Sequence, residues 1–391
     1  MTARRDIKGL YYITHIDNVP SILKRGILSH QLVDEQKIPF TPIYDASIVR
    51  SRRERTAPDG KSLWTFANLY FQPRNPMMYR VINEKDKRLI AVVEVERQVL
   101  NDLATFIAVG NAASPLSEIL PVKEGLAAIA QIWDVITNDW WREEDGSKRK
   151  IMAECLVPDV VPPELIHAVY VASYDVAVKI PSATTRPVPV VPEPKMFFQP
   201  TLAVSITDKL SLVDGDMFFS QRQTLTVSVN TVGVMGKGLA SRTKYQFPDV
   251  YVFYQDLCHK KVLQMGRPYL YKRESLVDTL LADDSYPLPG KNNNKWFLLF
   301  PTKRHWRDKS DISGIETGLA WVRNNYAREG IESLAMPALG CGLGGLAWRD
   351  IGPLMCKYLA DLDIGVSIYL PREQPIPREL CTPGFLLQQR R

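Results

Sequence analysis

Cysteine is scarce in this chain of 391 residues, and its few cysteines are spread along the sequence. They are odd in number and far apart, which excludes a disulfide framework and a clustered metal site as the basis of the fold. A reducing, cytoplasmic location is therefore expected. The cysteines lie at positions 155, 258, 341, 356 and 381.

Long apolar runs and strong net charge are also missing. No stretch reaches about 18 consecutive apolar residues, the length that a membrane-spanning helix needs. The N-terminal segment "MTARRDIKGLYYITHIDN" carries positive charge but no apolar run of the length that a secretory signal has. The net charge of +6 permits a polyanionic partner without indicating one.

The length of the chain and one proline-rich segment predict two domains. Residues 181–200 contain six prolines and no periodic apolar pattern. Such a segment favours extended polyproline geometry and acts as a semi-rigid spacer. The sequence therefore predicts an N-terminal domain at 1–180, a linker at 181–200 and a C-terminal domain at 201–391.

Strand-like and helix-like patterns alternate in the C-terminal domain. This alternation predicts an α/β sandwich with a largely parallel or mixed sheet. In such sheets, ligands bind beyond the carboxyl ends of the strands. The predicted strands are 225–230, 295–300, 333–339 and 365–370, and the predicted helices are 238–258 and 313–329.

Two glycine-rich loops follow predicted strands of this domain. One is "NTVGVMGKGLA", which leads into a helix, and the other is "GCGLGGLAW". Glycines let backbone N–H groups approach a phosphate closely, and a helix N-terminus favours the negative charge of a phosphate. One such loop is often only a tight turn. Two at neighbouring strand ends, with Asp216 after another strand, indicate a phosphate-bearing ligand.

These strings, together with "GDMF" and "FPTKRHWR", resemble the macrodomain, the ADP-ribose-binding fold, over essentially all of residues 200–370. More narrowly they resemble the DarG family of DNA ADP-ribosylglycohydrolase antitoxins. The resemblance implies an α/β/α domain in which Asp216 contacts the adenine amino group and Asn230 sits at the distal ribose. The glycines implied to hold the diphosphate and ribose of ADP-ribose include Gly236, Gly238, Gly342 and Gly344.

The family's catalytic lysine falls on Lys303, where a predicted strand ends in a basic cluster. Taken alone, such a cluster is more often a solvated surface or a phosphate-binding patch. A partly desolvated lysine near other cations can instead act as a free amine and attack the anomeric carbon of an opened ribose. We therefore assign catalysis to Lys303 and DNA phosphate contacts to Arg304, His305 and Arg307. Gly344 stands where other macrodomain branches have an acidic residue, so a helper carboxylate must come from elsewhere or be absent.

In the N-terminal domain, a glutamate interrupts the apolar strand "IMAECLV". Glu154 lies either on the wet face of that strand or in a cleft, and the residues leave both alternatives open. Upstream, a short strand precedes a helix that begins after Asp17 or Asn18 and ends at Gly26.

The strings "YITHIDNVPSILKRGILSH", "YFQPRNPMMY" and "AECLVPDVVPPELI" resemble the DarT family of DNA ADP-ribosyltransferase toxins, over residues 8–175. The resemblance implies the split β-core of ADP-ribosyltransferases, an α+β domain that grips NAD in a bent shape. Glu154 matches the catalytic glutamate, which would stabilise the oxocarbenium-like charge as nicotinamide leaves. The catalytic arginine falls in "RSRRER" on Arg53, with Arg52 as the alternative, although such a run is otherwise typical of a solvated helix. Residues implied to bind NAD are Tyr12, Thr14, His15, Arg52, Tyr70 and Tyr79.

Two further features concern the ligands of the N-terminal domain. Tyr12 stands where relatives commonly have histidine, and a tyrosine can stack and donate a hydrogen bond but cannot become an imidazolium. Trp140 and Trp141 lie among alternating charges, a pattern that suits base stacking on single-stranded nucleic acid. Packing of both tryptophans on the core explains that pattern equally well.

Both resemblances together predict a natural toxin–antitoxin fusion that runs one reaction in both directions. The first domain would transfer ADP-ribose from NAD to a base of single-stranded DNA, with thymine favoured, and the second would remove it. No metal is needed by either site. Contact between the two domains within one chain is expected. The alternatives are an ADP-ribosylation cycle on RNA or protein, and a reader of ADP-ribose or nucleic acid with inactive sites.

Overall fold

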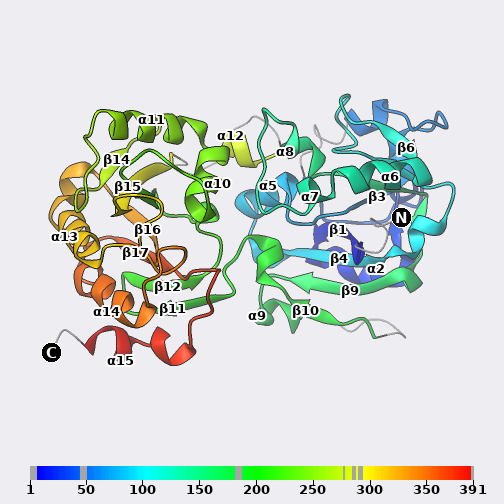
Figure 1. Cartoon of the computed structure of the whole chain (residues 1–391). Coiled ribbons are helices and arrows are strands. Elements are labelled where there is room, and N and C mark those ends of the chain that lie inside the picture. Colours follow the sequence, from blue (N-terminus) through cyan, green and yellow to red (C-terminus); the bar gives the residue numbers. More distant parts are fainter. Residues whose placement is uncertain are drawn as a thin grey trace. The chain divides into compact units, whose positions relative to one another are not determined.

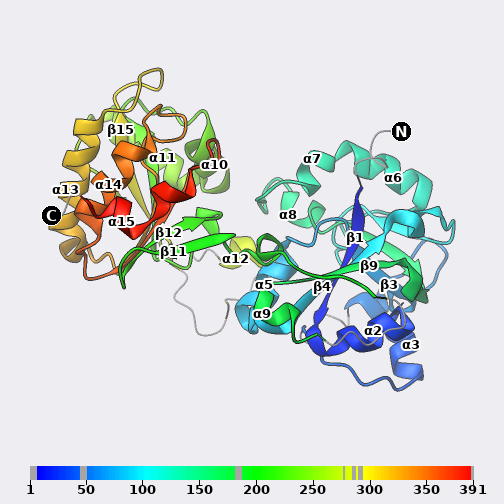
Figure 2. The same cartoon turned by 90° about the horizontal axis from the view of Figure 1, so that it is seen from below.

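A computed structural model of the chain describes residues 7–44, 51–180, 187–275, 278–283, 288 and 294–388. It divides into two compact units (Figures 1 and 2). Unit 1 comprises Met1–Gln199 with Asp278–Lys291, and unit 2 comprises Pro200–Val277 with Asn292–Arg391. The mixed α/β architecture of both units confirms the predicted fold class.

Among the described residues, unit 1 is built on an eight-stranded sheet in the order β10-β9-β4-β1-β3-β7-β5-β6. Every neighbouring pair is antiparallel except β10 with β9. A two-stranded sheet lies beside it, formed by β2 (Ile27–Leu28) and β8 (Val160–Val161). The eight strands are β1 (Gly9–His15), β3 (Phe66–Tyr70), β4 (Ile90–Glu96), β5 (Phe106–Ala108), β6 (Ile119–Pro121), β7 (Glu154–Pro158), β9 (Ile166–Val171) and β10 (Val190–Pro192).

The apolar side chains of the central strands of unit 1 explain why these strands are buried. β4 reads "IAVVEVE", and all but its last residue are buried, because a strand covered on both faces needs a continuous apolar run. β7 is equally apolar and lies between β3 and β5, with Glu154 opposite Tyr70 and Ala108. The helices of unit 1 include α2 (Val19–Arg25), α3 (His30–Glu35), α5 (Pro76–Glu84), α6 (Val122–Gln131), α7 (Trp133–Ile136), α8 (Ser147–Lys150) and α9 (Tyr174–Ala177).

Unit 2 has a seven-stranded sheet in the order β11-β12-β17-β16-β13-β15-β14 within the described part of the chain. The five inner strands are parallel and the two edge strands are antiparallel. The strands are β11 (Leu202–Ser205), β12 (Leu210–Asp214), β13 (Thr224–Asn230), β14 (Tyr269–Tyr271), β15 (Trp296–Lys303), β16 (Ser333–Pro337) and β17 (Gly365–Tyr369).

Helices cover both faces of this sheet, as the alternating pattern predicts. Figure 1 shows α13 and α14 on one side and α10 and α11 on the other. The predicted helix 238–258 is two helices, because Pro248 lacks the N–H that would continue the first and instead begins the second. The helices of unit 2 are α10 (Gly238–Gln246), α11 (Pro248–His259), α13 (Ile312–Glu329), α14 (Trp348–Leu359) and α15 (Pro383–Leu386).

Much of the proline-rich segment 181–200 is ordered, although residues 181–186 lie outside the described part. Val190–Pro192 form β10, which extends the sheet of unit 1 beside β9. Further on, Phe197 is fully buried. A proline-rich strand is tolerated here because β10 is an edge strand, where missing N–H groups interrupt no ladder.

One short segment belongs by its contacts to unit 1 although its chain neighbours belong to unit 2. Helix α12 (Asp278–Leu281) follows β14 in the chain and contacts α5. Leu281 and Ala282 are buried, and the carboxylate of Asp283 lies 2.7 Å from Nε of Arg80, which is itself buried. No described helix is both long and apolar enough to cross a bilayer.

Candidate active sites

The first candidate site centres on Glu154, at the start of β7 in the middle of the sheet. Its side chain is fully buried, so the cleft alternative describes it rather than the wet face. Nη2 and Nη1 of Arg52 lie 2.5 and 3.4 Å from its two carboxylate oxygens, and the N–H of Ala112 donates to it at 2.9 Å. A buried carboxylate held by a guanidinium and a backbone N–H is fixed in direction.

The arginines of the run 50–55 contact different partners. Arg52 is the arginine that reaches Glu154, whereas the side chain of Arg53 is largely exposed, lying over the ring of Trp64 and 3.4 Å from Asp34. Arg55 donates to the carbonyls of Ala112, Ser114 and Ser117, so it holds the loop that supplies the N–H to Glu154. Arg50 lies outside the described residues.

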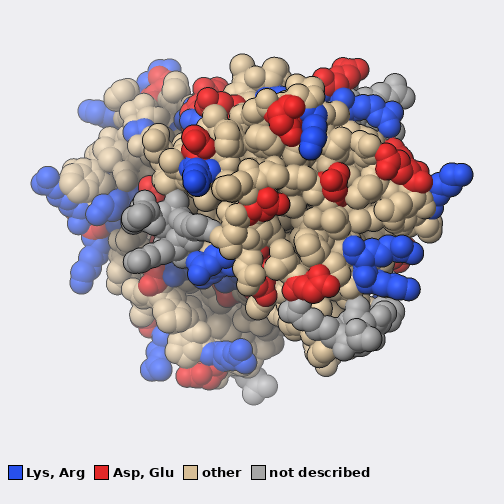
Figure 3. Space-filling view, turned by 90° about the vertical axis from the view of Figure 1, so that its right-hand side faces the viewer, with Lys and Arg blue, Asp and Glu red and all other residues tan. Residues whose placement is uncertain are grey.

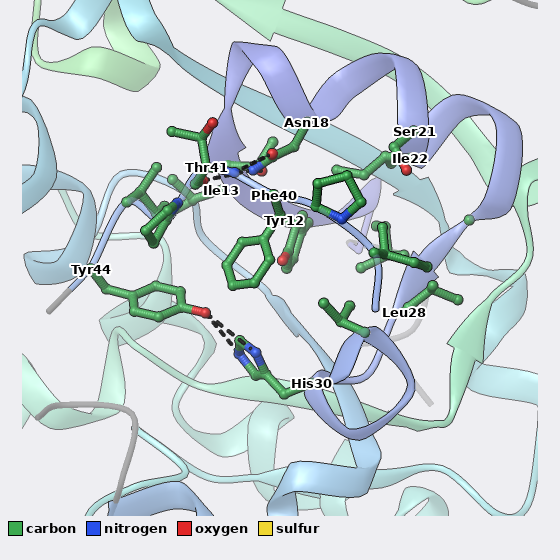
Figure 4. A pocket seen from close by; sticks show the side chains of 18 residues that line it. Tyr12, Ile13, Asn18, Ser21, Ile22, Leu28, His30, Phe40, Thr41 and Tyr44 are labelled. Atoms are coloured by element: carbon green, nitrogen blue, oxygen red, sulfur yellow. Dashed lines mark hydrogen bonds between the residues drawn. The ribbon is translucent and has the colours of Figure 1, made fainter. Parts of the chain in front are cut away.

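A pocket of about 660 Å³, including its open mouth, is lined from β1, α2, α3 and the segment 38–44, and neither Glu154 nor Arg52 is among its lining residues. Figure 4 shows the hydroxyl of Tyr44 pointing at the ring of His30, while Asn18 joins α2 to Thr41 through hydrogen bonds of 2.8 Å. Of the residues implied to bind NAD, Tyr12 and Thr14 line this pocket.

Electrostatics connect the pocket to the Glu154–Arg52 pair. Burial lowers the pKa of Arg52, but the Glu154 carboxylate outweighs burial, and the net pKa is raised. Arg52 in turn opposes the rise that burial causes in the pKa of Tyr12 and Tyr44. Burial and the Glu154 carboxylate raise the pKa of Tyr70, to which Asp283 also contributes. The charge of Arg52 thus acts on Tyr12 and Tyr44, two side chains that line the pocket.

The other residues of unit 1 that were predicted to bind NAD or DNA have different neighbours. His15 is buried and accepts a hydrogen bond from the N–H of Asp17 at the start of the next turn. The ring of Tyr79 packs edge-on against Phe198, with centroids 5.6 Å apart. Trp141 is 1% exposed and also packs edge-on against Phe198, as its packing alternative predicts, so it offers no face to a base. Trp140 is half-buried.

The second candidate site lies at the carboxyl edge of the sheet in unit 2. Asp216 follows β12, and its carboxylate accepts two hydrogen bonds from Nη1 of Arg242, at 2.9 and 2.8 Å. Arg372, after β17, lies 3.4 Å from the same carboxylate. The position of Asp216 beyond the end of β12 agrees with the edge of the sheet where a ligand was predicted. The contact of Arg242 was not predicted, because no motif marks a lone arginine within a helix.

Asn230 organises the first glycine-rich loop. Its amide oxygen accepts from the N–H groups of Val232 and Val234 and from the hydroxyl of Tyr254, and its amide nitrogen donates to the carbonyl of Val234 at 2.6 Å. Within the described residues this loop leads through Gly236 to Gly238, where α10 begins with φ of +59°, a left-handed conformation that favours glycine. Asn230 thus holds the loop from behind.

Lys303 ends β15 directly beside Asn230, where a register shift in the β13–β15 pair displaces the strand ends. Its Nζ lies 3.4 Å from the carbonyl of Leu343, so the lysine reaches the second glycine-rich loop. A Cβ on Gly344 would lie 2.3 Å from Oγ of Ser310, so no side chain fits there. This contact explains why an acidic residue is missing at that position.

The basic cluster after Lys303 lies on the surface. Arg304 and Arg307 are exposed, and the guanidinium of Arg307 stacks 4.5 Å from the ring centroid of Trp306, which is 47% exposed. His305 accepts a hydrogen bond from the N–H of Arg307, which stabilises the turn. Cations beside an exposed aromatic ring suit a single nucleic-acid strand. Figure 3 draws a face of unit 1 and not this cluster, and on that face basic and acidic side chains are interspersed.

Comparison with known proteins defines the class. A family model described as "ssDNA thymidine ADP-ribosyltransferase, DarT" matches residues 11–198, and a model described as "Macro domain" matches residues 227–355. The chain is therefore a two-domain protein that joins a DarT transferase domain to a macrodomain.

Relatives in which both domains occur together define the family more closely. The "DNA ADP-ribosyl transferase-DNA ADP-ribosyl glycohydrolase fusion protein" of Thermosipho africanus (strain H17ap60334) is 57% identical over 97% of this chain and 98% of that protein. A solved structure, "Thermosipho africanus DarTG in complex with ADP-ribose", matches with a TM-score of 0.92 and 55% identity over 97% of this chain and 100% of that chain. The "DNA ADP-ribosyl glycohydrolase" of Thermus aquaticus is 34% identical over 42% of each chain. The chain belongs to the family of DNA ADP-ribosyl transferase–DNA ADP-ribosyl glycohydrolase fusion proteins, and it contains both enzyme domains.

His30, which lines the pocket, generates a pH prediction. Its ring stacks on Trp64, and burial together with Arg52 lowers its pKa from 6.5 to about 4. The unfolded chain binds this proton near pH 6.5, so the stability that neutral His30 contributes is complete above pH 6.5 and is lost as pH falls toward 4. We expect the unfolding free energy of His30→Gln to rise less steeply with pH in that window. The slope should fall by up to about 1.4 kcal/mol per pH unit.

Denaturant unfolding at several pH values checks this prediction. His167→Gln, at an exposed histidine of β9, provides the matched control for the loss of a histidine. An unaltered slope in His30→Gln would mean that His30 takes up its proton in the folded chain as readily as in the unfolded chain.

Proposed function

We propose that unit 1 transfers ADP-ribose from NAD to thymine in single-stranded DNA and that unit 2 removes it through Lys303. In domain terms, residues 1–180 carry the transferase and residues 201–391 the glycohydrolase, joined by 181–200. The observation that carries the proposal is the fully buried Glu154, held by Arg52, whose charge acts on Tyr12 and Tyr44 in the wall of the pocket. Thymine is favoured because the matching DarT model is described as a single-stranded-DNA thymidine ADP-ribosyltransferase.

In the transfer step, NAD lies in the pocket with its nicotinamide ribose toward Glu154. The carboxylate stabilises the positive charge that develops on the ribose as the bond to nicotinamide breaks. Arg52 and the N–H of Ala112 fix both carboxylate oxygens, so little reorganisation is needed when that charge appears. The thymine nitrogen then attacks the anomeric carbon and loses its proton. Tyr12 and Thr14 bind the NAD ligand from β1.

In the removal step, ADP-ribose lies across the two glycine-rich loops of unit 2, with adenine toward Asp216. The amine of Lys303 forms a bond to the anomeric carbon of the opened ribose, the bond to the thymine nitrogen breaks, and that nitrogen takes a proton. Water then releases ADP-ribose and restores the lysine. Arg304, His305 and Arg307 hold the DNA strand that carries the modified base. Neither step calls for a metal.

A chain that both writes and erases a DNA lesion fits a toxin joined to its own antitoxin, acting in growth control or phage defence. A cytoplasmic location is supported by the free thiols of all five cysteines. We also propose that the antitoxin half restrains the toxin half by contact. The support is the path of the chain: Leu281, Ala282 and Asp283 lie in sequence between β14 and β15 of unit 2 but pack within unit 1 on α5.

Substitutions at the first site should separate its two candidate arginines. In a Lys303→Ala background, we expect Glu154→Gln and Arg52→Ala each to lower the transfer rate by about 100-fold or more, because one removes the stabilising charge and the other its orientation. Arg53→Ala is the matched control, since its side chain points away from Glu154.

The measurement is mass spectrometry of oligonucleotides of each base composition incubated with NAD. Loss of transfer in Arg53→Ala with retention in Arg52→Ala would reverse the assignment. Modification of RNA or of the protein in place of thymine-containing DNA would favour the alternative acceptors.

Replacement of Lys303, the lysine proposed to remove ADP-ribose, should make the chain toxic to the cells that express it. Cells that express Lys303→Ala should grow much more slowly than cells with the wild-type chain, and Glu154→Gln in the same chain should restore growth. Lys209→Ala, at an exposed lysine of unit 2, controls for the loss of a surface charge. Equal growth of wild type and Lys303→Ala at matched expression would contradict a role for enzymatic reversal.

Weakening the contact at α5 should raise the initial transfer rate even when reversal is absent. In the Lys303→Ala background we expect several-fold faster transfer after Asp283→Ala, because Arg80 keeps Glu84 but loses the carboxylate that joins it to the segment. Asp256→Ala, at an exposed pair with Lys260, is the control. An unchanged initial rate would leave enzymatic reversal as the antitoxin activity.

A further inference from the structure

A carboxylate from the segment after β17 lies between the two glycine-rich loops of unit 2. A Cβ placed on Gly342 would be 3.0 Å from Oε2 of Glu373, and a Cβ placed on Gly238 would be 3.7 Å from Oε1 of the same residue. The carboxylate therefore lies within van der Waals reach of both loops. Glu373 comes from neither loop, so its position is a property of the fold and not of either motif.

The chain on both sides of Glu373 is anchored. On one side, Arg372 lies 3.4 Å from the carboxylate of Asp216, next to the end of β12. On the other side, Cys381 is buried and the indole N–H of Trp348 donates to the carbonyl of Leu380 at 2.9 Å. Glu373 itself is exposed and can turn away without disturbing the core.

Backbone N–H groups of both loops lie near this carboxylate. In the described part of the chain, no group accepts a hydrogen bond from the N–H of Gly342, Leu343 or Gly344. Opposite them, α10 begins at Gly238, where the first N–H groups of a helix have no partner within the helix. Such an arrangement attracts negative charge. In this structure, the negative group nearest to both Gly238 and Gly342 is Glu373.

We propose that Glu373 competes with the diphosphate of ADP-ribose for the space between the loops and so speeds the release of ADP-ribose after each cycle. This inference rests on the proposed placement of ADP-ribose across the glycine-rich loops. A carboxylate and a diphosphate cannot occupy that space together, because like charges a few ångströms apart repel strongly at a partly desolvated site. Binding of the diphosphate therefore displaces Glu373, and return of Glu373 displaces the diphosphate.

The competition affects product more than substrate. Free ADP-ribose is held by the loops and Asp216 alone, whereas a modified DNA strand also meets the basic cluster at Arg304 and Arg307. A fixed loss of affinity at the diphosphate thus shortens the stay of the product while the substrate keeps its additional contacts. Glu373 acts on turnover and takes no part in bond breaking.

Calorimetry with ADP-ribose and glycohydrolase kinetics on modified oligonucleotide test this role in the full-length Glu154→Gln chain, where transfer is silent. In that background we expect Glu373→Gln and Glu373→Ala to bind ADP-ribose about tenfold more tightly at low salt, an effect that shrinks at about 0.5 M NaCl. The single-turnover rate should stay unchanged, while the steady-state rate falls and inhibition by ADP-ribose strengthens. Glu379→Gln, an exposed glutamate of the same segment, should change none of these quantities.

Other outcomes decide against the proposal. Unchanged or weaker binding of ADP-ribose by both Glu373 variants overturns it. A fall in the single-turnover rate with unchanged affinity also overturns it, because Glu373 would then belong to the chemistry. Failure of the parent chain and of all variants to bind ADP-ribose overturns the proposed ligand site, and the competition with it.

Discussion

The architecture of unit 1 depends on one buried ion pair, Glu154 with Arg52. A carboxylate without exposure carries a large desolvation cost, which a bidentate guanidinium and a backbone N–H offset only with good geometry. That geometry requires β7 between β3 and β5, a helical turn at 51–54 and the loop that Arg55 clamps. Removal of either partner would leave a buried charge, so both residues of the pair are needed for a stable fold.

The site of unit 2 follows the opposite principle. Its two glycine-rich loops carry backbone N–H groups, Asn230 and Tyr254 support the first loop from behind, and Lys303 stands at a partly open strand end. Backbone donors carry no net charge and need no counter-ion, so the site can stay open to solvent. A buried, charge-paired site suits the formation of a reactive cation, whereas an open site suits the capture and release of a large nucleotide.

Much of the local structure around both candidate sites was predictable from local patterns. The apolar strand around Glu154, the glycine loops and Lys303 at a strand end each leave a mark within about ten residues of sequence, because strand ends and tight turns are local events. The choice of Arg52 over Arg53 was not predictable, since it depends on which face of a short helical turn meets β7. The contacts of Trp141 and Arg242 were equally unpredictable from the sequence, because their partners, Phe198 and Asp216, are distant in sequence. The predicted linker contains β10 for the same reason: its partner strand decides its structure.

The assignment of Asp278–Lys291 to unit 1 means that the chain passes between the units three times rather than once. A gene split at the proline-rich segment would therefore not yield two self-contained products. The first would lack Leu281 and Ala282 from its surface, and the second would display those apolar side chains without the helix that buries them. Inheritance of the two enzymes as a single reading frame is thus favoured by the topology itself, because separation would leave each product with an incomplete surface.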